Sequence, residues 1–332
     1  MSEILFPTHP AYRPKDYELI GKFDQLKSIL LTKYHIEIDK VEPINKGMNT
    51  NYVLYVKGKP SLQLKILTRK GYPAIEKLLL VQSLIKQSDV KCITLTNCDS
   101  SDKIFPYGYI IQKWFPGSDG ASLTRNQWIA DFVDNLKKVH KIEMPYYGSL
   151  EEGPRFRSIR EYYENIDLVI DKSFGSTLIG KQSIWDFHTN KLTTPDFIPR
   201  IFEHVYKLSK NLGEYTPHLV HGDMHEGNIM YTNKGTTLID WDEAKSHFWP
   251  VEIARTLFFS QDKGILKEFI QLYNDKNTPV EEVATIIKLE HIRQHLRQLF
   301  MAGFDKCSEE EIRTNVKIVE KRLQILVKVM EI

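Results

Sequence analysis

The fold of this chain is decided by the stretch His221-Gly222-Asp223-Met224-His225-Glu226-Gly227-Asn228-Ile229-Met230, together with Leu238-Ile239-Asp240-Trp241-Asp242. Short apolar runs flank these polar clusters, and Asn233-Lys234-Gly235 between them is typical of a hairpin turn. Such a hairpin would return Asp240 to the side of Asp223 and Asn228. Carboxylate and amide oxygens gathered in this way suit Mg²⁺, which usually completes its shell with water and phosphate. The sequence therefore predicts a magnesium site at this hairpin.

The same stretch resembles the catalytic loop of the aminoglycoside phosphotransferase and choline kinase family, whose pattern is H-G-D-x-H-x-x-N followed by I-D-[WF]. That family shares with protein kinases a base Asp, a metal-binding Asn five residues later and a metal-binding Asp after a hairpin. The resemblance implies Asp223 as the catalytic base and Asn228 and Asp240 as Mg²⁺ ligands. It also implies ATP, or GTP, as the phosphoryl donor.

Three further polar residues belong to this motif. His221 is expected to brace the loop by hydrogen bonding. His225 and Asp242 are expected to contact the catalytic and metal-binding residues without binding the metal themselves. An alternative interpretation is a zinc or iron hydrolase site built on His221 and His225, since imidazole and carboxylate suit those metals. That alternative needs further ligands and leaves Asn228 and Asp240 without a role.

The composition excludes several other classes of protein. The 332 residues are 42% hydrophobic and 27% charged, which is typical of a globular protein, and the net charge of +2 gives no reason to propose nucleic acid as a partner. The three cysteines, Cys92, Cys98 and Cys307, are too few for a disulfide framework and lack zinc-site spacing. No apolar run approaches the ~18 residues needed to span a membrane. We therefore expect a soluble cytoplasmic protein without a membrane partner, either a monomer or a homodimer.

Apolar periodicity predicts an N-terminal sheet of about five antiparallel strands. The strands are expected at 41–44, 52–56, 62–67, 92–96 and 107–115, with helices at about 14–30 and 73–86. Lys65 lies in the middle of the third strand, where the plain interpretation is an exposed lysine on a half-buried strand. The resemblance instead implies that Lys65 holds nucleotide phosphates. No G-x-x-x-x-G-K-[ST] motif offers another phosphate site.

The resemblance implies further nucleotide-binding residues at Asn51, Glu76, Gln112, Lys113 and Trp114. Asn51 ends the polar loop 47–51, which would cover the phosphates. Glu76 would pair with Lys65, although the helix dipole alone also favours a glutamate in a first helical turn. The segment 111–115 would be the hinge between lobes and bind adenine through its backbone, and its aromatic side chains suit a purine pocket and lobe packing equally.

From residue 123 onward, helical patterns dominate, at 124–139, 159–170, 197–212, 283–299 and 312–330. His140 is expected to be a structural hydrogen-bonding residue, and Glu252 in segment 249–255 is expected to anchor the catalytic loop. The late helices carry several acids, namely Glu290, Glu309, Glu310 and Glu311. These acids are expected to face solvent, and the alternative is an acceptor pocket.

Together these features predict an α+β fold of the two-lobe protein-kinase type, with a nucleotide-binding lobe at 1–115 and a catalytic, acceptor-binding helical lobe at 116–332. The expected function is Mg-ATP-dependent O-phosphorylation of a small molecule. The first acceptor class is a hydroxyl-bearing, often cationic, antibiotic, which would make the protein a resistance kinase. The alternatives are a metabolic kinase acting on homoserine, choline or a sugar, and a non-catalytic structural protein with a kinase-like fold.

Overall fold

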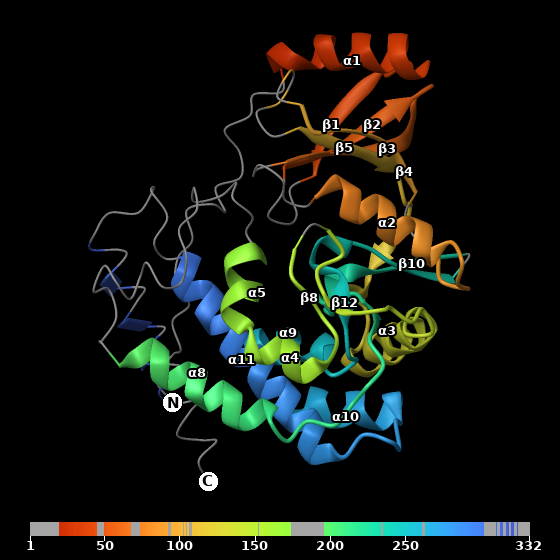
Figure 1. Cartoon of the computed structure of the whole chain (residues 1–332). Coiled ribbons are helices and arrows are strands. Elements are labelled where there is room, and N and C mark those ends of the chain that lie inside the picture. Colours follow the sequence, from red (N-terminus) through yellow and green to blue (C-terminus); the bar gives the residue numbers. More distant parts are fainter. Residues whose placement is uncertain are drawn as a thin grey trace.

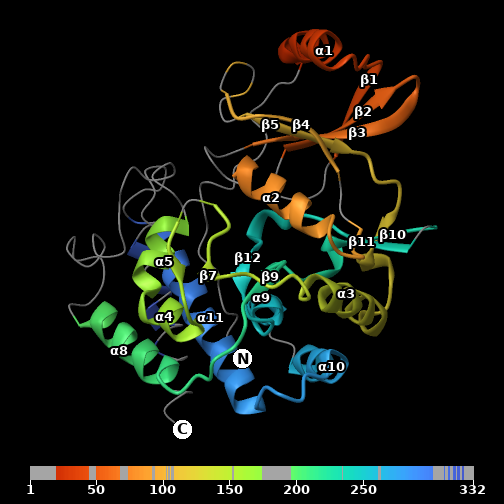
Figure 2. The same cartoon turned by 45° about the vertical axis from the view of Figure 1, so that its right-hand side comes forward.

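The computed structural model describes residues 20–44, 50–67, 74–91, 94–101, 108–151, 153–173, 196–233, 235–260 and 263–301, together with 103, 105 and isolated positions between 310 and 324. Over these residues the chain has an antiparallel sheet in its N-terminal part and is mainly helical in its C-terminal part, as Figures 1 and 2 show. The predicted α+β two-lobe fold is confirmed.

The N-terminal sheet has five antiparallel strands in the order β1-β2-β3-β5-β4. They are β1 (Lys40–Ile44), β2 (Thr50–Val56), β3 (Lys59–Ile66), β4 (Leu95–Asp99) and β5 (Tyr109–Lys113). Helix α1 (Ile20–Tyr34) covers one face, where Leu30 and Leu64 are fully buried in one cluster. Because side chains alternate along a strand, Gln63 and Lys65 point to the opposite face. That face is turned toward the helical part of the molecule (Figure 1).

Helix α2 (Ile75–Ile85) lies between the sheet and the helical part, as both views show (Figures 1 and 2). Its Val81 and Ile85 are buried in the large core of the C-terminal part, whereas Ile75 packs under the sheet against Ile110. By its packing α2 therefore joins the two parts. The expected boundary between residues 115 and 116 stays a prediction.

Seven helices account for most of the described C-terminal part. They are α3 (Arg125–Val139), α4 (Ile159–Glu164), α5 (Ile166–Ser173), α8 (Phe197–Ser209), α9 (Val251–Ser260), α10 (Lys263–Tyr273) and α11 (Val280–Met301). The predicted helix at 159–170 is divided at Asn165, and the helix expected at 312–330 lies largely outside the described residues. Helices α9 and α10 were not predicted. None of the described helices is both long enough and apolar enough to cross a membrane.

Two small sheets position the motif residues. Their orders are β11-β10-β6 and β8-β7-β12-β9. The strands are β6 (Ser118–Asp119), β7 (Tyr147–Gly148), β8 (Arg155–Phe156), β9 (His218–Val220), β10 (Ile229–Thr232), β11 (Gly235–Leu238) and β12 (Lys245–His247). Strand β9 runs directly into His221. Strands β10 and β11 pair from Thr232↔Gly235 to Ile229↔Leu238, which confirms the predicted hairpin, and Gly235 supplies its positive φ of 105°.

Candidate active site

The loop that begins at His221 is held by buried hydrogen bonds. Glu252, which is fully buried at the start of α9, accepts from the backbone N–H of His221 and from that of Gly222, both at 2.7 Å. Gly222 has a φ of +77°, and a Cβ there would lie 2.6 Å from the carbonyl oxygen of Glu243, so only glycine fits this turn. The predicted anchoring role of Glu252 is confirmed.

Two histidines brace the same network. The His221 Nε2 donates to the carbonyl oxygen of Ile239 at 2.8 Å, and its Nδ1 accepts from the N–H of Asp223 at 3.3 Å. His140 lies 3.0 Å from Glu252 through Nε2 and 2.7 Å from the Tyr273 hydroxyl through Nδ1. Burial lowers the pKa of His221, and burial lowers the pKa of His140 to about 3. Both rings are therefore neutral structural groups, as expected.

We expect Glu252→Ala to destabilise the fold by about 3 kcal/mol, because two buried N–H groups and His140 lose their acceptor. The measurement is the free energy of unfolding in urea. Glu252→Asp keeps the carboxylate and should lose less, and Glu281→Ala, at an exposed position on α11, should stay within about 0.5 kcal/mol of the parent. A Glu252→Ala protein as stable as the Glu281→Ala control would show that the loop does not depend on this anchor.

Asp223 follows this anchor and faces a basic residue. Its Oδ1 lies 2.7 Å from the Arg255 Nε, and its Oδ2 lies 4.0 Å from the His225 Nε2. The side chain of Asp223 is 17% exposed. Burial raises the pKa of Asp223, and Arg255 opposes that change. The carboxylate is thus held in one orientation while it keeps some access to the outside.

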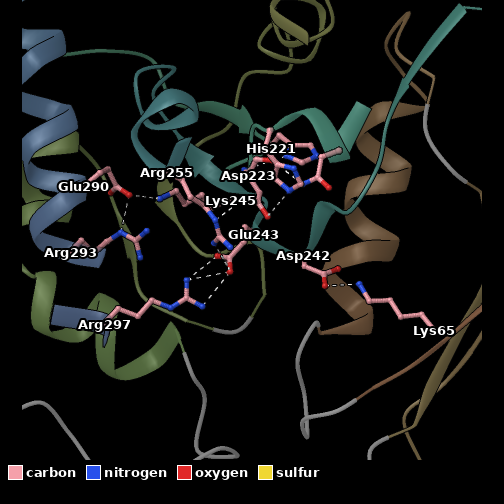
Figure 3. Close-up of polar contacts among 12 residues, drawn as sticks. Lys65, His221, Asp223, Asp242, Glu243, Lys245, Arg255, Glu290, Arg293 and Arg297 are labelled. Carbon is pink, nitrogen blue, oxygen red and sulfur yellow. Dashed lines mark hydrogen bonds and ion pairs between the residues drawn. The ribbon is translucent and has the colours of Figure 1, made fainter. Parts of the chain in front are cut away.

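Lys65 contacts two acids, Asp240 and Asp242, on the side of Asp223 that faces away from Arg255. Its Nζ lies 3.1 Å from Asp240 Oδ1 and 2.6 Å from Asp242 Oδ2, and the close-up in Figure 3 draws the contact with Asp242. Burial alone would lower the pKa of Lys65, but the two aspartates raise it above its usual value. Lys65 is only 8% exposed, so the plain interpretation of an exposed strand lysine is wrong.

Asn228 and Asp240 are brought together by the hairpin. The N–H of Ile239 donates to the Asn228 carbonyl oxygen at 3.0 Å, and the Asn228 Nδ2 donates to the carbonyl oxygen of Asp223 at 2.9 Å. Asp240 has the left-handed φ of 60°, a conformation that costs free energy in residues with a Cβ and is often found at functional sites. The structure thus places both predicted ligands beside Asp223.

Their chemistry fits a hard divalent cation. Asp240 keeps 40% of its side chain exposed, whereas that of Asp242 is only 11% exposed, so Asp240 can still reach a ligand. Burial, and after it the negative charge of Asp240, raise the pKa of Asp242 to about 7 against the opposing effect of Lys65. An amide oxygen from Asn228 and a carboxylate from Asp240 would suit Mg²⁺.

A polar row follows the sheet face that carries Lys65. The Gln63 Nε2 donates to Asn51 Oδ1 at 3.3 Å, and the Gln112 Nε2 donates to Gln63 Oε1 at 3.0 Å. Asn51 belongs to β2 and pairs with Lys65, so its expected place in a loop is wrong. Gln63 was missed by the sequence reasoning, although its position two residues before Lys65 on a strand puts it on the same face.

Two backbone N–H groups of the expected hinge donate hydrogen bonds within the N-terminal sheet. The N–H of Lys113 donates to the Thr94 carbonyl oxygen at 3.0 Å, and the N–H of Trp114 donates to the Ser61 carbonyl oxygen at 2.9 Å. The Lys113 side chain is exposed, and Trp114 is half-buried. These two N–H groups therefore serve the sheet. Any adenine contact of the hinge would have to use its carbonyl oxygens or a neighbouring N–H.

Glu76 does not take its expected place. It is exposed on α2, whereas the next residue, Lys77, is buried and lies 3.6 Å from Glu151. The acids that contact Lys65 come from beyond the hairpin instead, at Asp240 and Asp242. The expected pairing of Glu76 with Lys65 is wrong in this structure. The direction of a helical side chain cannot be derived from its distance along the chain.

A cavity adjoins the motif on the side away from Lys65. It is lined by Lys77, Gly148, Ser149, Glu151, Pro154, Tyr162, Val169, Gly222, Glu243, Ala244, Lys245, Val251, Arg255, Glu290, Arg293, Gln294 and Arg297. Glu290 is 2% exposed, so the expectation that it faces solvent is wrong, whereas Glu310 is exposed as expected. Sequence reasoning missed the basic residues here. Arg293 and Arg297, spaced three and seven residues after Glu290 on one helix face, were the available signal.

The hydrolase alternative does not fit this geometry. Both ring nitrogens of His221 are engaged, one with a carbonyl oxygen and one with an N–H, so neither can bind zinc or iron. The described residues contain no group of three or more His, Cys, Asp or Glu side chains that could hold a metal ion. A cation at this site would instead have the oxygens of Asn228 and Asp240 as its protein ligands and would need water or phosphate oxygens to complete its shell.

Comparisons with known proteins find this fold in solved structures of phosphotransferases. Among solved structures, a thermostable mutant of aminoglycoside phosphotransferase APH(4)-Ia in ternary complex with AMP-PNP and hygromycin B has a TM-score of 0.62 at 13% identity, with 92% of this chain and 98% of that chain covered. Spectinomycin phosphotransferase APH(9)-Ia with ADP and spectinomycin has a TM-score of 0.59 at 17% identity, covering 93% and 98%. ADP-bound APH(2'')-Ib has a TM-score of 0.60 at 14% identity, covering 91% and 97%.

These likenesses show a shared fold, and no curated protein matches the chain. The family model described as the phosphotransferase enzyme family matches residues 40–282, which include Lys65, the catalytic-loop motif and Glu252. This match covers most of the chain and shows that the protein belongs to the phosphotransferase enzyme family.

Proposed function

We propose that this protein is a kinase that transfers the γ-phosphoryl group of ATP to a hydroxyl of a small molecule, with Mg²⁺ as cofactor. The observation that carries the proposal is the position of Asp223. On one side the hairpin gathers Asn228 and Asp240 next to Lys65, and on the other Arg255 joins Asp223 to the cavity. A base between a phosphate-binding cluster and an acceptor cavity is the arrangement that phosphoryl transfer needs.

Each residue has a distinct task in this proposal. Asp223 would accept the proton of the attacking hydroxyl, and its contact with Arg255 would hold the carboxylate in line. Lys65 would hold the α- and β-phosphates once it leaves the two aspartates, and Asn228 and Asp240 would hold Mg²⁺. When bound, Mg-ATP supplies the phosphoryl group and its metal neutralises the charge on the phosphates.

The remaining nucleotide contacts are also proposals. Asn51 and Gln112 line the sheet face above Lys65 through their bonds with Gln63, and the base of ATP or GTP would lie beneath this row. The carbonyl oxygen of Lys113 would contact the purine, and Trp114 would help to enclose it. We do not assign Glu76 a role in nucleotide binding, because it is exposed on α2.

The identity of the acceptor is tested by a panel with Mg-ATP. It should contain hygromycin B and spectinomycin, which the similar structures bind, together with choline, homoserine and methylthioribose-like sugars. We propose an antibiotic as the first acceptor class and a metabolic alcohol as the second. ADP release that depends on an acceptor and stops when EDTA removes Mg²⁺ is the expected result. A protein that binds Mg-ATP but never turns it over would support the non-catalytic alternative.

We expect Asp240→Asn to weaken the binding of AMP-PNP in the presence of Mg²⁺ by about tenfold or more, because the site loses its exposed carboxylate ligand. Isothermal titration with and without EDTA gives the measurement. Without metal the variant and the parent should bind the nucleotide alike to within a few-fold. An equal loss of affinity in both buffers would contradict the assignment of Asp240 as the metal ligand.

A further inference from the structure

The cavity beside Asp223 is walled by charged side chains from distant parts of the chain. Arg255 on α9 both lines the cavity and contacts Asp223 at 2.7 Å. Arg293 and Arg297 project from α11, and Figure 3 shows them on the side of Asp223 opposite to Lys65. A molecule in this cavity would therefore meet Asp223 from the acceptor side.

Among the described residues that line the cavity, five are basic and three are acidic. The basic residues are Lys77, Lys245, Arg255, Arg293 and Arg297, and the acidic residues are Glu151, Glu243 and Glu290. If Asp223 is added as a fourth carboxylate, the wall still carries one positive charge in excess. Lys77, Glu290, Arg293 and Arg297 are buried and the other charged groups are half-buried, so solvent screens the excess only in part.

The carboxylates are shared between cations. Glu290 lies 3.1 Å from the Lys245 Nζ and 2.9 Å from the Arg293 Nε. Glu243 likewise lies 3.0 Å from Arg255 and 3.1 Å from Arg297. Glu290 and Glu243 thus each divide their charge between two bases, and Glu151, the third acid, lies 3.6 Å from Lys77. A cation that enters the cavity would meet carboxylates that already face basic residues, whereas an anion would meet guanidinium groups, each of which carries five N–H donors.

The environment of Lys245 agrees with this geometry. Burial, and then the charge of Arg293, lower the pKa of Lys245 to about 8, despite the opposing effect of Glu290. Burial is the larger of the two causes, and the repulsion from Arg293 makes a further positive charge at this part of the cavity wall unfavourable. A polycationic acceptor would add several positive charges to it and would be bound at a cost.

We propose that the natural acceptor carries an anionic group, a carboxylate or a phosphate, in addition to the hydroxyl that is phosphorylated, and this charge puts a metabolic alcohol ahead of a cationic antibiotic as the acceptor class. This inference rests on the proposed kinase function. Arg293 and Arg297 would bind the anionic group, because their planar guanidinium groups match carboxylate and phosphate oxygens. The hydroxyl would then point toward Asp223 at the Arg255 end of the cavity.

The test compares acceptors that differ only in charge, namely glycerate with glyceramide and homoserine with homoserine amide, and adds hygromycin B as a polycation. With Mg-ATP the acids should have kcat/KM values more than tenfold above those of their amides. Arg297→Gln should remove most of this preference, and Arg297→Lys, which keeps the charge, should retain part of it. Arg293→Gln replaces Arg297→Gln if that variant does not fold, as judged by its unfolding midpoint.

A binding experiment covers the case in which none of these alcohols is the true acceptor. With the nucleotide site saturated by AMP-PNP, inorganic phosphate at millimolar concentration should raise the unfolding temperature of the parent, and spermidine should not. Arg297→Gln should weaken the effect of phosphate.

Tighter binding of spermidine than of phosphate, no effect of phosphate, or faster phosphorylation of amides or hygromycin B than of acids would overturn the anionic acceptor. A protein that binds no Mg-ATP at all would instead refute the kinase function itself.

Discussion

Asp223→Asn should lower kcat by about 10²- to 10⁴-fold, the range that a general base contributes. Asparagine has the same shape as aspartate and can still accept a hydrogen bond from Arg255, but it cannot take a proton from the acceptor hydroxyl. The affinity for AMP-PNP should stay within a few-fold of the parent, because Lys65, Asn228 and Asp240 remain in place. Turnover is measured as ADP release with the acceptor that the panel identifies, or with water as the acceptor.

The control for this variant is Asp134→Asn on α3, at an exposed acid paired with Lys138 four residues later. It should leave both kcat and nucleotide affinity unchanged. An Asp223→Asn protein that keeps the parental kcat would show that the proton goes elsewhere. A loss of kcat accompanied by an equal loss of nucleotide affinity would point to a damaged site and not to a missing base.

The centre of the site could be predicted because its determinants are local. Asp223, Asn228 and Asp240 lie within eighteen residues on a loop and a hairpin, and the register of that hairpin follows from two apolar runs and a turn. Glycine at 222 and the buried carboxylate at 252 then hold the loop. Sequence reasoning could place these groups relative to one another without knowledge of the rest of the fold.

The contacts of Lys65 could not be predicted from local sequence patterns. The sequence separations from Lys65 to Asp240 and Asp242 are 175 and 177 residues, and only the packing of the sheet on the helical part makes these contacts. The resemblance supplied Lys65 as a phosphate-binding residue but supplied the wrong partner, Glu76. A helix can present a glutamate to the cleft or to solvent after a small rotation, and the sequence does not specify that rotation.

The acceptor side could not be predicted for a related reason. Helix α11 carries apolar residues such as Ile286, Leu289 and Leu296, which are buried in the structure. In the sequence, charged residues stand between them, and this alternation is typical of a helix with one face exposed to solvent. In the structure α11 is surrounded by α5, α8 and α9, so charges such as Glu290 are buried as well. Periodicity indicates a helix but does not show how many neighbours cover it.

Glu290→Gln should destabilise the protein by about 3 to 5 kcal/mol, which would be among the largest effects of a single substitution in this chain. Glu290 is the shared counter-charge of Lys245 and Arg293, and it also accepts from the Tyr163 hydroxyl at 3.2 Å. Glutamine keeps the shape but leaves the buried Arg293 and the half-buried Lys245 without their carboxylate. Urea unfolding at pH 7 measures the loss, with the exposed Glu281→Gln as control.

A double-mutant cycle separates charge from packing. Arg293→Met removes one of the two cations, so the combination Glu290→Gln/Arg293→Met should lose less than the sum of the single losses. Strict additivity of the two losses, or a Glu290→Gln protein as stable as the Glu281→Gln control, would contradict the inferred role of Glu290 as a buried counter-charge.

The charge network around Glu290 also predicts how the stability of the fold depends on pH. Burial opposes ionisation of Glu290, but Arg293 and Lys245 more than offset it and hold the pKa of Glu290 far below its usual range. Because the folded pKa is depressed, the unfolded chain binds this proton first as the pH falls. Glu290 therefore contributes its full stability above the ordinary glutamate range, near pH 4.3, and loses it progressively below that range. In Glu290→Gln this part of the acid loss should be absent, so the stability difference from the parent should shrink below about pH 4. A difference that stays constant down to pH 2 would show that Glu290 is not held ionised by its two basic neighbours, and the count of charges in the acceptor cavity would have to change with it.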